Sequence, residues 1–331
     1  MTGIGQIVRN KGMKPLLPLG VIAGVFLWMA ISCSNQEIVV QKKSVYKMSV
    51  YPDSSFVGDI KALQFHDSLL YFLDINRRSL LMMDRNLSAL HSVSRGGRAQ
   101  EELLDPFSFT VSGDSVFIID FGGFKMKSFH NGVFVEEKTV PVNTRDQRFV
   151  KDGNTFFLPI RDAEASVVKT TLTNLPITLL QTEKFFSPMK TVTMNACHIL
   201  SYRQNLIIVP EALPWVKIIS EDGEVVRTID LTHSALYSRN ISFAQKADRD
   251  EKGFYVLNSD ICIAGDVLLI LIPTYGERYT CNRIVSVSLS SGEMMETVMS
   301  LPGIVYSNFC SDGKLIYAFN SSENQIEVYE M

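Results

Sequence analysis

The sequence Gly265-Asp266-Val267-Leu268-Leu269-Ile270-Leu271-Ile272 places a polar turn directly before six consecutive apolar residues. Successive side chains of a β-strand point to opposite faces, so a strand that is apolar throughout is buried on both faces. A strand of a solvent-facing sheet alternates apolar and polar residues instead. This stretch therefore predicts a strand held between two packed layers.

The same unit recurs five more times along the chain. The other five polar turns and apolar strands are Asp67-Ser68 before Leu69–Leu73, Gly113-Asp114-Ser115 before Val116–Ile119, Asp152-Gly153-Asn154 before Thr155–Leu158, Gln204-Asn205 before Leu206–Val209, and Asp312-Gly313-Lys314 before Leu315–Phe319. Each is preceded by one strand candidate and followed by one or two, the last more polar, as in Val133–Thr139. Four strands in roughly 40 to 60 residues are the size of a propeller blade.

The two ends of the chain fit a closed ring. The last unit stops at Met331 after its third strand, whereas a spare strand, Val45–Val50, precedes the first unit. The sequence therefore predicts an all-β, six-bladed β-propeller over residues 45–331, closed by pairing of Val45–Val50 with Ile326–Glu330. Two alternatives stay open: a β-helix with shorter rungs, and two β-sandwiches joined by a linker at Thr173–Pro188. The longest irregular stretch, Thr232–Gly253, is expected to be a solvated excursion from one rim.

The N-terminal segment predicts export. Lys14 precedes about sixteen apolar or small residues and then Ala30-Ile31-Ser32-Cys33, which resembles a bacterial lipoprotein signal and its lipobox. The domains expected are a signal peptide at 1–32, a lipidated N-terminus and tether at 33–44, and the propeller. The alternative is an uncleaved helix with Cys33 as a core thiol. Translation could begin at Met1 or at Met13.

The net charge of the chain limits the kinds of partner that can be expected. Removing residues 1–32 takes away three basic residues and no acids, so the formal net charge changes from −3 to about −6. The sequence therefore predicts no nucleic-acid partner, and one membrane contact, the bilayer reached through acylated Cys33. Localisation as an outer-membrane lipoprotein follows, with the choice between the periplasmic face and the cell surface left open.

One further segment is Gly97-Arg98-Ala99-Gln100-Glu101-Glu102-Leu103-Leu104-Asp105-Pro106. With this segment, the lipobox and the repeated units, the chain resembles the six-bladed TolB-like or NHL-like propeller lipoproteins of gut Bacteroidetes. The family's loop between the first two blades often reads Gly-Arg-Gly-Pro-x-Glu, an aromatic residue or Leu, two free positions and Pro. Ala99 and Gln100 depart from its Gly-Pro. The resemblance implies architecture and location but carries over no catalytic residue.

Motifs for chemistry are missing from the sequence. The five histidines lack zinc-site spacing, and the nucleophile-elbow, phosphate-loop and dinucleotide motifs do not occur, so no cofactor is predicted. Cys197, Cys262, Cys281 and Cys310 lie in or beside apolar runs, which favours buried thiols over disulfides without deciding between them.

Two functions remain. The sequence favours a non-catalytic binding or scaffold module for a protein, peptide or glycan in the cell envelope. The alternative is a metal-assisted hydrolase or lyase with a divalent ion in the channel. The residues considered for that ion, which also suit ordinary turns, are Asp74, Asp120, Glu211, Asn258, Asp260 and Asn320. The aromatic residues considered for a sugar or peptide platform are Trp215, Tyr237, Phe243, Tyr275 and Tyr279.

Overall fold

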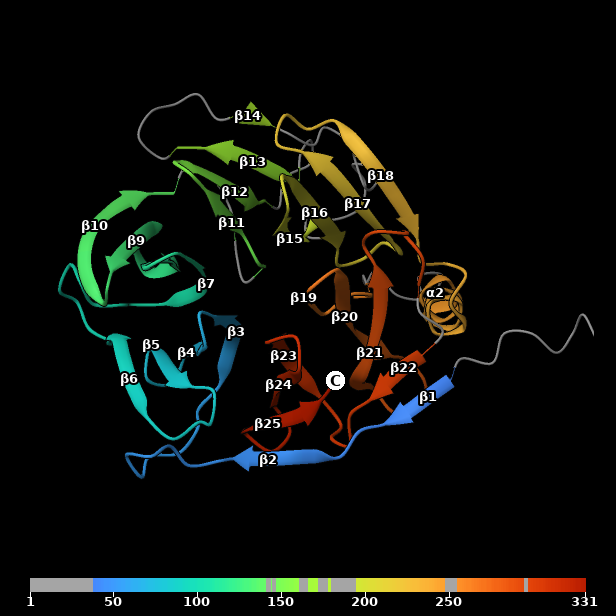
Figure 1. Cartoon of the computed structure of the whole chain (residues 1–331), viewed down its shortest axis with the longest axis horizontal. Helices are drawn as coiled ribbons and strands as arrows, with labels where there is room; N and C mark the ends of the chain where they lie inside the picture. The colour runs from blue at the N-terminus through green and yellow to red at the C-terminus, as the bar shows by residue number, and fades with distance from the viewer. Residues whose placement is uncertain are drawn as a thin grey trace, which may run out of the picture. The chain divides into compact units, whose positions relative to one another are not determined.

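The computed structural model describes residues 38–140, 144, 147–160, 166–171, 178–179, 195–247, 255–294 and 297–331. The expected signal peptide, Cys33 and most of Thr173–Pro188 lie outside these residues. Residues 37–331 form one compact unit, in which six sheets are arranged in a ring (Figure 1). The predicted six-bladed β-propeller is therefore confirmed.

Each blade is a meander whose innermost strand comes first. Blades one and two consist of β3 (Ile60–His66), β4 (Leu69–Asp74), β5 (Ser79–Asp84) and β6 (Leu90–Ser94), then β7 (Pro106–Ser112), β8 (Ser115–Asp120), β9 (Lys125–His130) and β10 (Val133–Thr139), with the short 3-10 helix η1 (Phe121–Gly123) after β8. Blades three and four consist of β11 (Val150–Asp152), β12 (Thr155–Pro159), β13 (Val167–Thr170) and β14 (Thr178–Leu179), then β15 (Cys197–Tyr202), β16 (Asn205–Pro210), β17 (Trp215–Ser220) and β18 (Val225–Asp230).

The last two blades each take an outer strand from the start of the described chain. Blade five consists of β19 (Asp260–Ala264), β20 (Val267–Thr274), β21 (Thr280–Ser288), β22 (Thr297–Ser300) and β1 (Ile38–Gln41), and blade six of β23 (Tyr306–Ser311), β24 (Leu315–Asn320), β25 (Gln325–Glu330) and β2 (Ser44–Met48). Strand β2 runs antiparallel to β25, with Met48 opposite Ile326. The predicted closure of the ring is confirmed, although the strand ends at Met48 and Val50 pairs with Phe56 instead.

Part of residues 33–44, where the sequence predicts a tether, forms a strand of blade five. This strand, β1, pairs in parallel with β22, from Ile38 opposite Thr297 to Gln41 opposite Ser300. The sequence argument missed this strand because its four residues lie outside the repeated unit of polar turn and apolar strand, although Ile38-Val39-Val40 are of the β-branched type that is common in strands. The chain is therefore held to blade five before it closes blade six.

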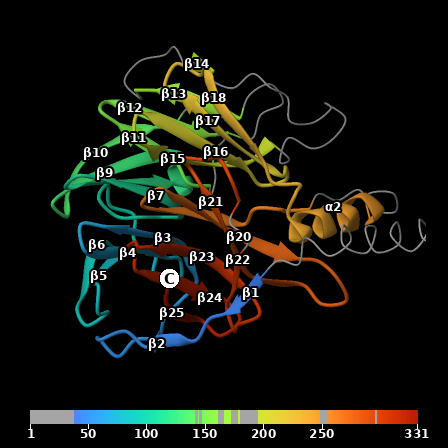
Figure 2. The same cartoon turned by 45° about the vertical axis from the view of Figure 1, so that its right-hand side comes forward.

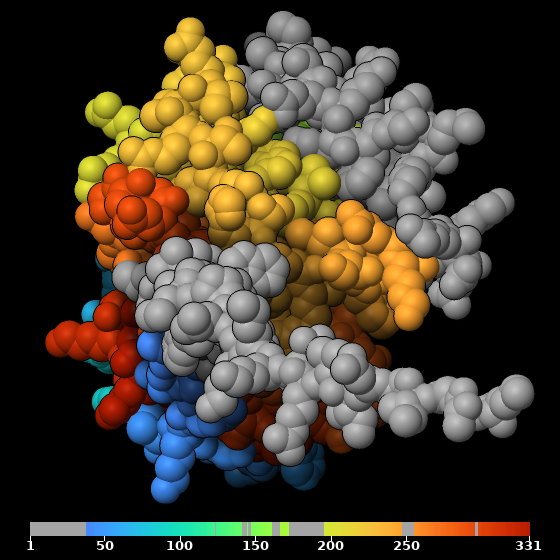
Figure 3. Space-filling view, turned by 90° about the vertical axis from the view of Figure 1, so that its right-hand side faces the viewer, coloured from blue at the N-terminus to red at the C-terminus, as the bar shows by residue number. Residues whose placement is uncertain are grey.

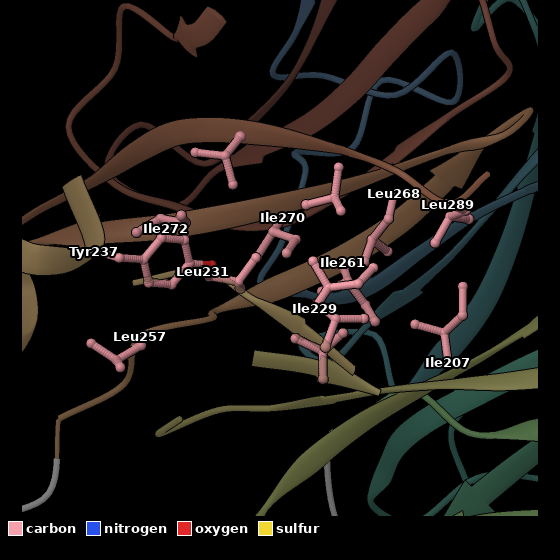
Figure 4. Packing of buried hydrophobic residues seen from close by; sticks show 14 of the residues in the cluster. Ile207, Ile229, Leu231, Tyr237, Leu257, Ile261, Leu268, Ile270, Ile272 and Leu289 are labelled. Atoms are coloured by element: carbon pink, nitrogen blue, oxygen red, sulfur yellow. The ribbon is translucent and has the colours of Figure 1, made fainter. Parts of the chain in front are cut away.

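The hydrophobic core is divided into six clusters, one for each interface between neighbouring blades. Strand β20 shows why its sequence is apolar throughout. Leu268, Ile270 and Ile272 pack toward blade four, whereas Leu269 and Leu271 pack toward blade six. Figure 4 shows the first of these two interfaces, with side chains from β16, β18, β19 and β20 in contact. Burial on both faces thus holds adjacent blades together.

The expectation of an irregular excursion at Thr232–Gly253 was wrong over most of its described length. Helix α2 (Ala235–Ala247) occupies it and projects from the side of the ring (Figure 2). Ser234 caps the helix, since its Oγ accepts the N–H of Leu236 at 3.2 Å. Leu236, Tyr237 and Asn240 are buried at helical spacing. Interspersed charges conceal this short pattern in the sequence.

A buried carboxylate links the closing strand to blade six. Glu327 on β25 is fully buried and forms an ion pair with Lys47 on β2 at 2.7 Å. Its carboxylate also accepts hydrogen bonds from the hydroxyl of Tyr306, at 2.5 Å, and from the hydroxyl of Tyr329. Burial by itself would raise the pKa of Glu327, but the hydrogen bonds from Lys47 and the two tyrosines outweigh it and lower the pKa. The folded state therefore favours the ionised form of the Glu327 carboxyl group.

We expect Glu327→Gln to destabilise the protein at pH 7 by roughly 1–3 kcal/mol, the cost of weakening a buried charged hydrogen-bond acceptor. Because the folded-state pKa is below the unfolded value of about 4.3, the carboxylate stabilises the fold above that value and the contribution is lost as the pH falls through the folded pKa. Urea unfolding of both proteins at pH 7 and below pH 4 checks this. The difference should shrink in acid, and a difference independent of pH would contradict it. Glu330→Gln, an exposed change on the same strand, is the control.

Candidate functional site

A pocket of about 230 Å³ opens at one mouth of the central channel. All six innermost strands contribute to it, five of them through residues in their C-terminal halves and β11 together with the two residues before it, so the inner hairpin turns surround the opening. Its lining residues are Gln64, Phe65, Phe109, Thr110, Val111, Arg148, Phe149, Val150, Lys151, Leu200, Ser201, Cys262, Ile263, Cys310 and Ser311. The walls are thus mainly aromatic, aliphatic and uncharged, with two basic residues.

Arg148, from the segment leading into β11, crosses the channel at the inner end of this pocket. Its Nε and one terminal nitrogen donate to the two carboxylate oxygens of Asp260 at 2.7 and 2.8 Å. The guanidinium also donates to the backbone carbonyls of Leu63 at 2.9 Å and Phe309 at 2.7 Å. One side chain from blade three therefore binds the innermost strands of blades one, five and six. Such a bidentate fork is a geometry that lysine cannot provide.

Burial and neighbouring charges determine which side chains around the pocket are charged. Burial disfavours the charged form of Arg148, but attraction to Asp260 outweighs this effect and raises the pKa of Arg148. Burial raises the pKa of the Cys262 thiol and of the Cys310 thiol well above the ordinary value, so both are neutral at pH 7. A neutral thiol is a poor nucleophile. Cys197, Cys262, Cys281 and Cys310 are all buried and free, as the apolar-run argument favours.

Lys151, the second basic residue of the pocket lining, directs its ammonium group toward Phe117 of blade two. Its ammonium donates to the carbonyl of Gly153 at 2.5 Å and lies 4.7 Å from the ring centroid of Phe117. That ring belongs to blade two, so Lys151 fills the interface between blades two and three. The pocket thus offers a ligand mostly neutral surface.

The six residues considered as metal ligands lie toward the opposite end of the blades. Asp74, opposite Ile60 at the start of β3, accepts hydrogen bonds from the Tyr51 hydroxyl at 2.8 Å and the Gly58 N–H at 3.2 Å. Asp120 accepts the Leu104 N–H at 3.0 Å. Both side chains therefore hold the segment that leads into the innermost strand of their own blade.

The next two candidates connect blade four to neighbouring parts of the ring. Glu211 accepts a 2.7 Å hydrogen bond from Gln147. Asn258 accepts the Tyr237 hydroxyl at 2.5 Å and donates to the Pro210 carbonyl at 2.6 Å, so it fastens helix α2 to the end of β16. Their polar atoms are used within the protein.

The last two candidates are also engaged. Asn320 accepts the Ser322 N–H at 3.2 Å and donates to Glu327 at 3.4 Å, and Asp260 is paired with Arg148. Within the described part of the chain, no three His, Cys, Asp or Glu side chains are grouped as metal ligands. The convergence that the metal-assisted alternative requires is therefore not seen among these residues.

The aromatic residues considered for a platform separate into two groups. Phe243 stacks on Tyr275 with centroids 5.4 Å apart, and Tyr279 lies 5.7 Å from Tyr275. Tyr255, which the sequence argument missed, completes this cluster beside α2. Tyr237 is fully buried, and Trp215 lies under the Lys217 ammonium instead. The cluster lies at the β20–β21 tip, the opposite end of blade five from the pocket.

The loop that carries the family resemblance is structural. Gly97 lies against Glu102 so closely that a Cβ would overlap its carboxylate. Glu102 accepts the Ala99 N–H at 2.9 Å and the Arg95 Nε–H at 3.0 Å. The matching glycine and glutamate thus close one loop, away from the pocket lining.

Arg148 was missed because nothing in its local sequence distinguishes it. Its partners come from positions 85, 112 and 161 residues away, so only the closed ring brings them together. The pocket lining was missed for the same reason. The one usable signal is that the residues before each inner polar turn must meet at one mouth of the ring.

Comparison with solved structures supports the fold. An exported protein from Bacteroides fragilis has a TM-score of 0.61 at 12% identity, over 88% of this chain and 98% of that one. A member of the DUF4221 family from Bacteroides vulgatus has a TM-score of 0.59 at 8% identity, over 89% and 98%. A streptogramin B lyase has a TM-score of 0.51 at 12% identity, over 86% and 87%. These identities establish likeness of fold alone.

Sequence comparison adds no family: no protein-family profile matches the chain, and no curated protein matches it. No helix in the described ranges has the length and apolar character needed to cross a bilayer.

Proposed function

We propose that this protein is a lipid-anchored, non-catalytic binding module of the cell envelope, and that its ligand enters the pocket at the channel mouth. The observation that supports the proposal is the convergence of all six innermost strands on one small, mostly neutral pocket. Ring-shaped convergence gives a concave surface without reactive groups.

The size and lining of the pocket limit the ligand. At about 230 Å³ it is smaller than the roughly 300–1,000 Å³ of a typical small-molecule site. It therefore suits one ring-sized group at the end of a glycan or peptide chain. Phe65 offers apolar surface, while Thr110 and Ser201 offer hydroxyl groups that can exchange hydrogen bonds with a neutral ligand.

Binding fits these groups better than catalysis. The two thiols in the wall are held neutral, and Arg148 is committed to Asp260 and to two carbonyls. A general base or nucleophile needs a shifted pKa matched to its task, together with a partner within hydrogen-bond reach. No described residue of the pocket lining combines the two.

The anchor is the second part of the proposal. Ala30-Ile31-Ser32-Cys33 after a basic residue and an apolar run supports diacylglyceration of Cys33 and attachment to the outer membrane. The Bacteroides fragilis protein of similar fold is described as exported, which is consistent with a place outside the cytoplasm.

Ser201→Trp should abolish ligand retention, because Ser201 lies exposed in the pocket lining and an indole there would fill the opening. A soluble chain beginning at Ser34 is incubated with an extract of cell-envelope glycans and peptides, washed, and analysed by mass spectrometry. We expect molecules retained by the wild type to fall at least about tenfold, or 1.4 kcal/mol, in Ser201→Trp.

Gln204→Trp is the matched control, since Gln204 is exposed on the same turn but does not line the pocket. It should retain the same molecules as the wild type. Equal retention by all three proteins would place binding elsewhere, and no retained molecule would contradict the proposed function.

A further inference from the structure

The rim formed by β1 and β2 is the first surface that the chain makes after the proposed lipid anchor. Strand β1 is the outermost strand of blade five, and β2 is the outermost strand of blade six. Figures 1 and 2 both show them following one another along the edge of the ring, and Figure 3 shows the blue atoms of these first strands at the surface. We use "anchor rim" for the residues of these two strands.

The anchor rim is apolar although it is exposed. Its large apolar side chains are 39% to 56% exposed, and they are Ile38, Val39, Val40, Val45 and Tyr46. Lys42 and Lys43 lie between the two strands, and Lys43 is exposed. Aliphatic residues beside a tyrosine and lysines are the composition of segments that lie in the interface of a membrane.

The length of chain between the anchor and β1 is short. Four residues lie between Cys33 and Ile38, and the five residue steps that join them span at most about 18 Å even when the chain is fully extended. That is less than the length of a six-residue strand, roughly 20 Å. An acylated Cys33 would therefore keep the start of β1 within one strand length of the lipid headgroups.

We propose that the anchor rim lies against the bilayer, with its apolar side chains in the headgroup interface. The inference rests on the proposed lipidation of Cys33. Coverage by lipid also protects β1, whose outer edge has no strand paired to it among the described residues. Exposed valines by themselves do not make the case, because Val133 and Val135 on β10 are exposed too. Strand β10 belongs to blade two and has no short link to Cys33, and its one lysine, Lys138, is paired with Glu136 at 2.6 Å.

The orientation has a consequence for the pocket. The anchor rim is made of outermost strands, whereas the pocket mouth is made of innermost strands. With the outer rim on the bilayer, the channel axis runs along the membrane and the pocket opens sideways. A ligand of the envelope can then enter without displacing the protein from its anchor.

Depth-dependent fluorescence quenching tests the inference. The full lipoprotein is labelled with an environment-sensitive fluorophore at Val40→Cys, or at Val135→Cys as the matched control, and reconstituted into phosphatidylethanolamine–phosphatidylglycerol vesicles containing headgroup nitroxide lipids. The four cysteines of the propeller are buried, so the introduced thiol is the one accessible to the label within the described residues. We expect at least threefold stronger quenching at position 40 than at position 135. Equal quenching at the two positions would overturn the inference.

The anchor is tested separately. Cells that express the wild type or Cys33→Ala are given a clickable fatty acid, and only the wild type should be labelled. Labelled wild type with equal quenching refutes the orientation and leaves the anchor standing. An unlabelled wild type refutes the anchor, and the orientation with it.

Discussion

A chain that begins at Ser49, and so lacks β1 and β2, is expected to melt roughly 10–20 °C below the chain that begins at Ser34. The truncation removes the burial of Met48, which contributes about 1.5–3 kcal/mol to the free energy of unfolding. It also removes Lys47 and so leaves the Glu327 carboxylate buried without its partner, which costs about 3–5 kcal/mol. In a protein of this size each kcal/mol shifts the melting temperature by about 2–4 °C. The open edge of β25 should also favour aggregation.

The control chain begins at Lys43 and lacks only β1. All four residues of β1 are exposed, so its removal should shift the melting temperature by a few degrees at most. Thermal melting followed by circular dichroism compares the three chains. If the chain from Ser49 melts with the chain from Ser34, closure by β2 does not hold the ring together.

Arg148→Met is expected to cost about 3–5 kcal/mol, since it leaves the Asp260 carboxylate buried and unpaired at the centre of the ring. The carbonyls of Leu63 and Phe309 lose a donor at the same time. Arg148→Lys should recover only part of this loss, because an ammonium cannot form the bidentate pair while also reaching both carbonyls. Urea unfolding measures the free energy for each variant.

A double variant separates the ion pair from packing. In Arg148→Met with Asp260→Asn neither of the two positions carries a buried charge, and the amide oxygen can still accept the Phe309 N–H that Asp260 accepts at 2.9 Å. The double variant should therefore be more stable than Arg148→Met alone. Substitutions at surface positions usually change the free energy of unfolding by less than about 1 kcal/mol. If the single and double variants also stay within about 1 kcal/mol of the wild type, Arg148 does not hold the centre of the ring together.

The fold was predictable because its rule is local. Each blade repeats a polar turn followed by an apolar strand, and β20 is apolar on both faces because blades four and six cover it. Closure by the spare N-terminal strand followed from counting strands. The place of β1 in blade five was not predictable, since the strand lies outside the repeated unit and pairs in parallel with β22, which is near the other end of the sequence.

The candidate site was less predictable, because it is made by closure of the ring. Polar residues at strand ends, such as Asp74 and Asn258, suggested ligands, but turns and blade connections use the same residues. Arg148 and the pocket lining depend on contacts between blades far apart in sequence. Sequence periodicity assigns residues to a blade but does not say which side chains meet at the channel mouth.

The most direct test of the account is calorimetry with the fraction retained by the wild-type protein in the envelope extract, followed by mass spectrometry of the same mixture. The account predicts binding at one molecule per chain, no detectable heat with Ser201→Trp, and a ligand of unchanged mass after prolonged incubation. Conversion of more than one molecule per chain into product would contradict a non-catalytic role, and unchanged heat with Ser201→Trp would contradict the pocket.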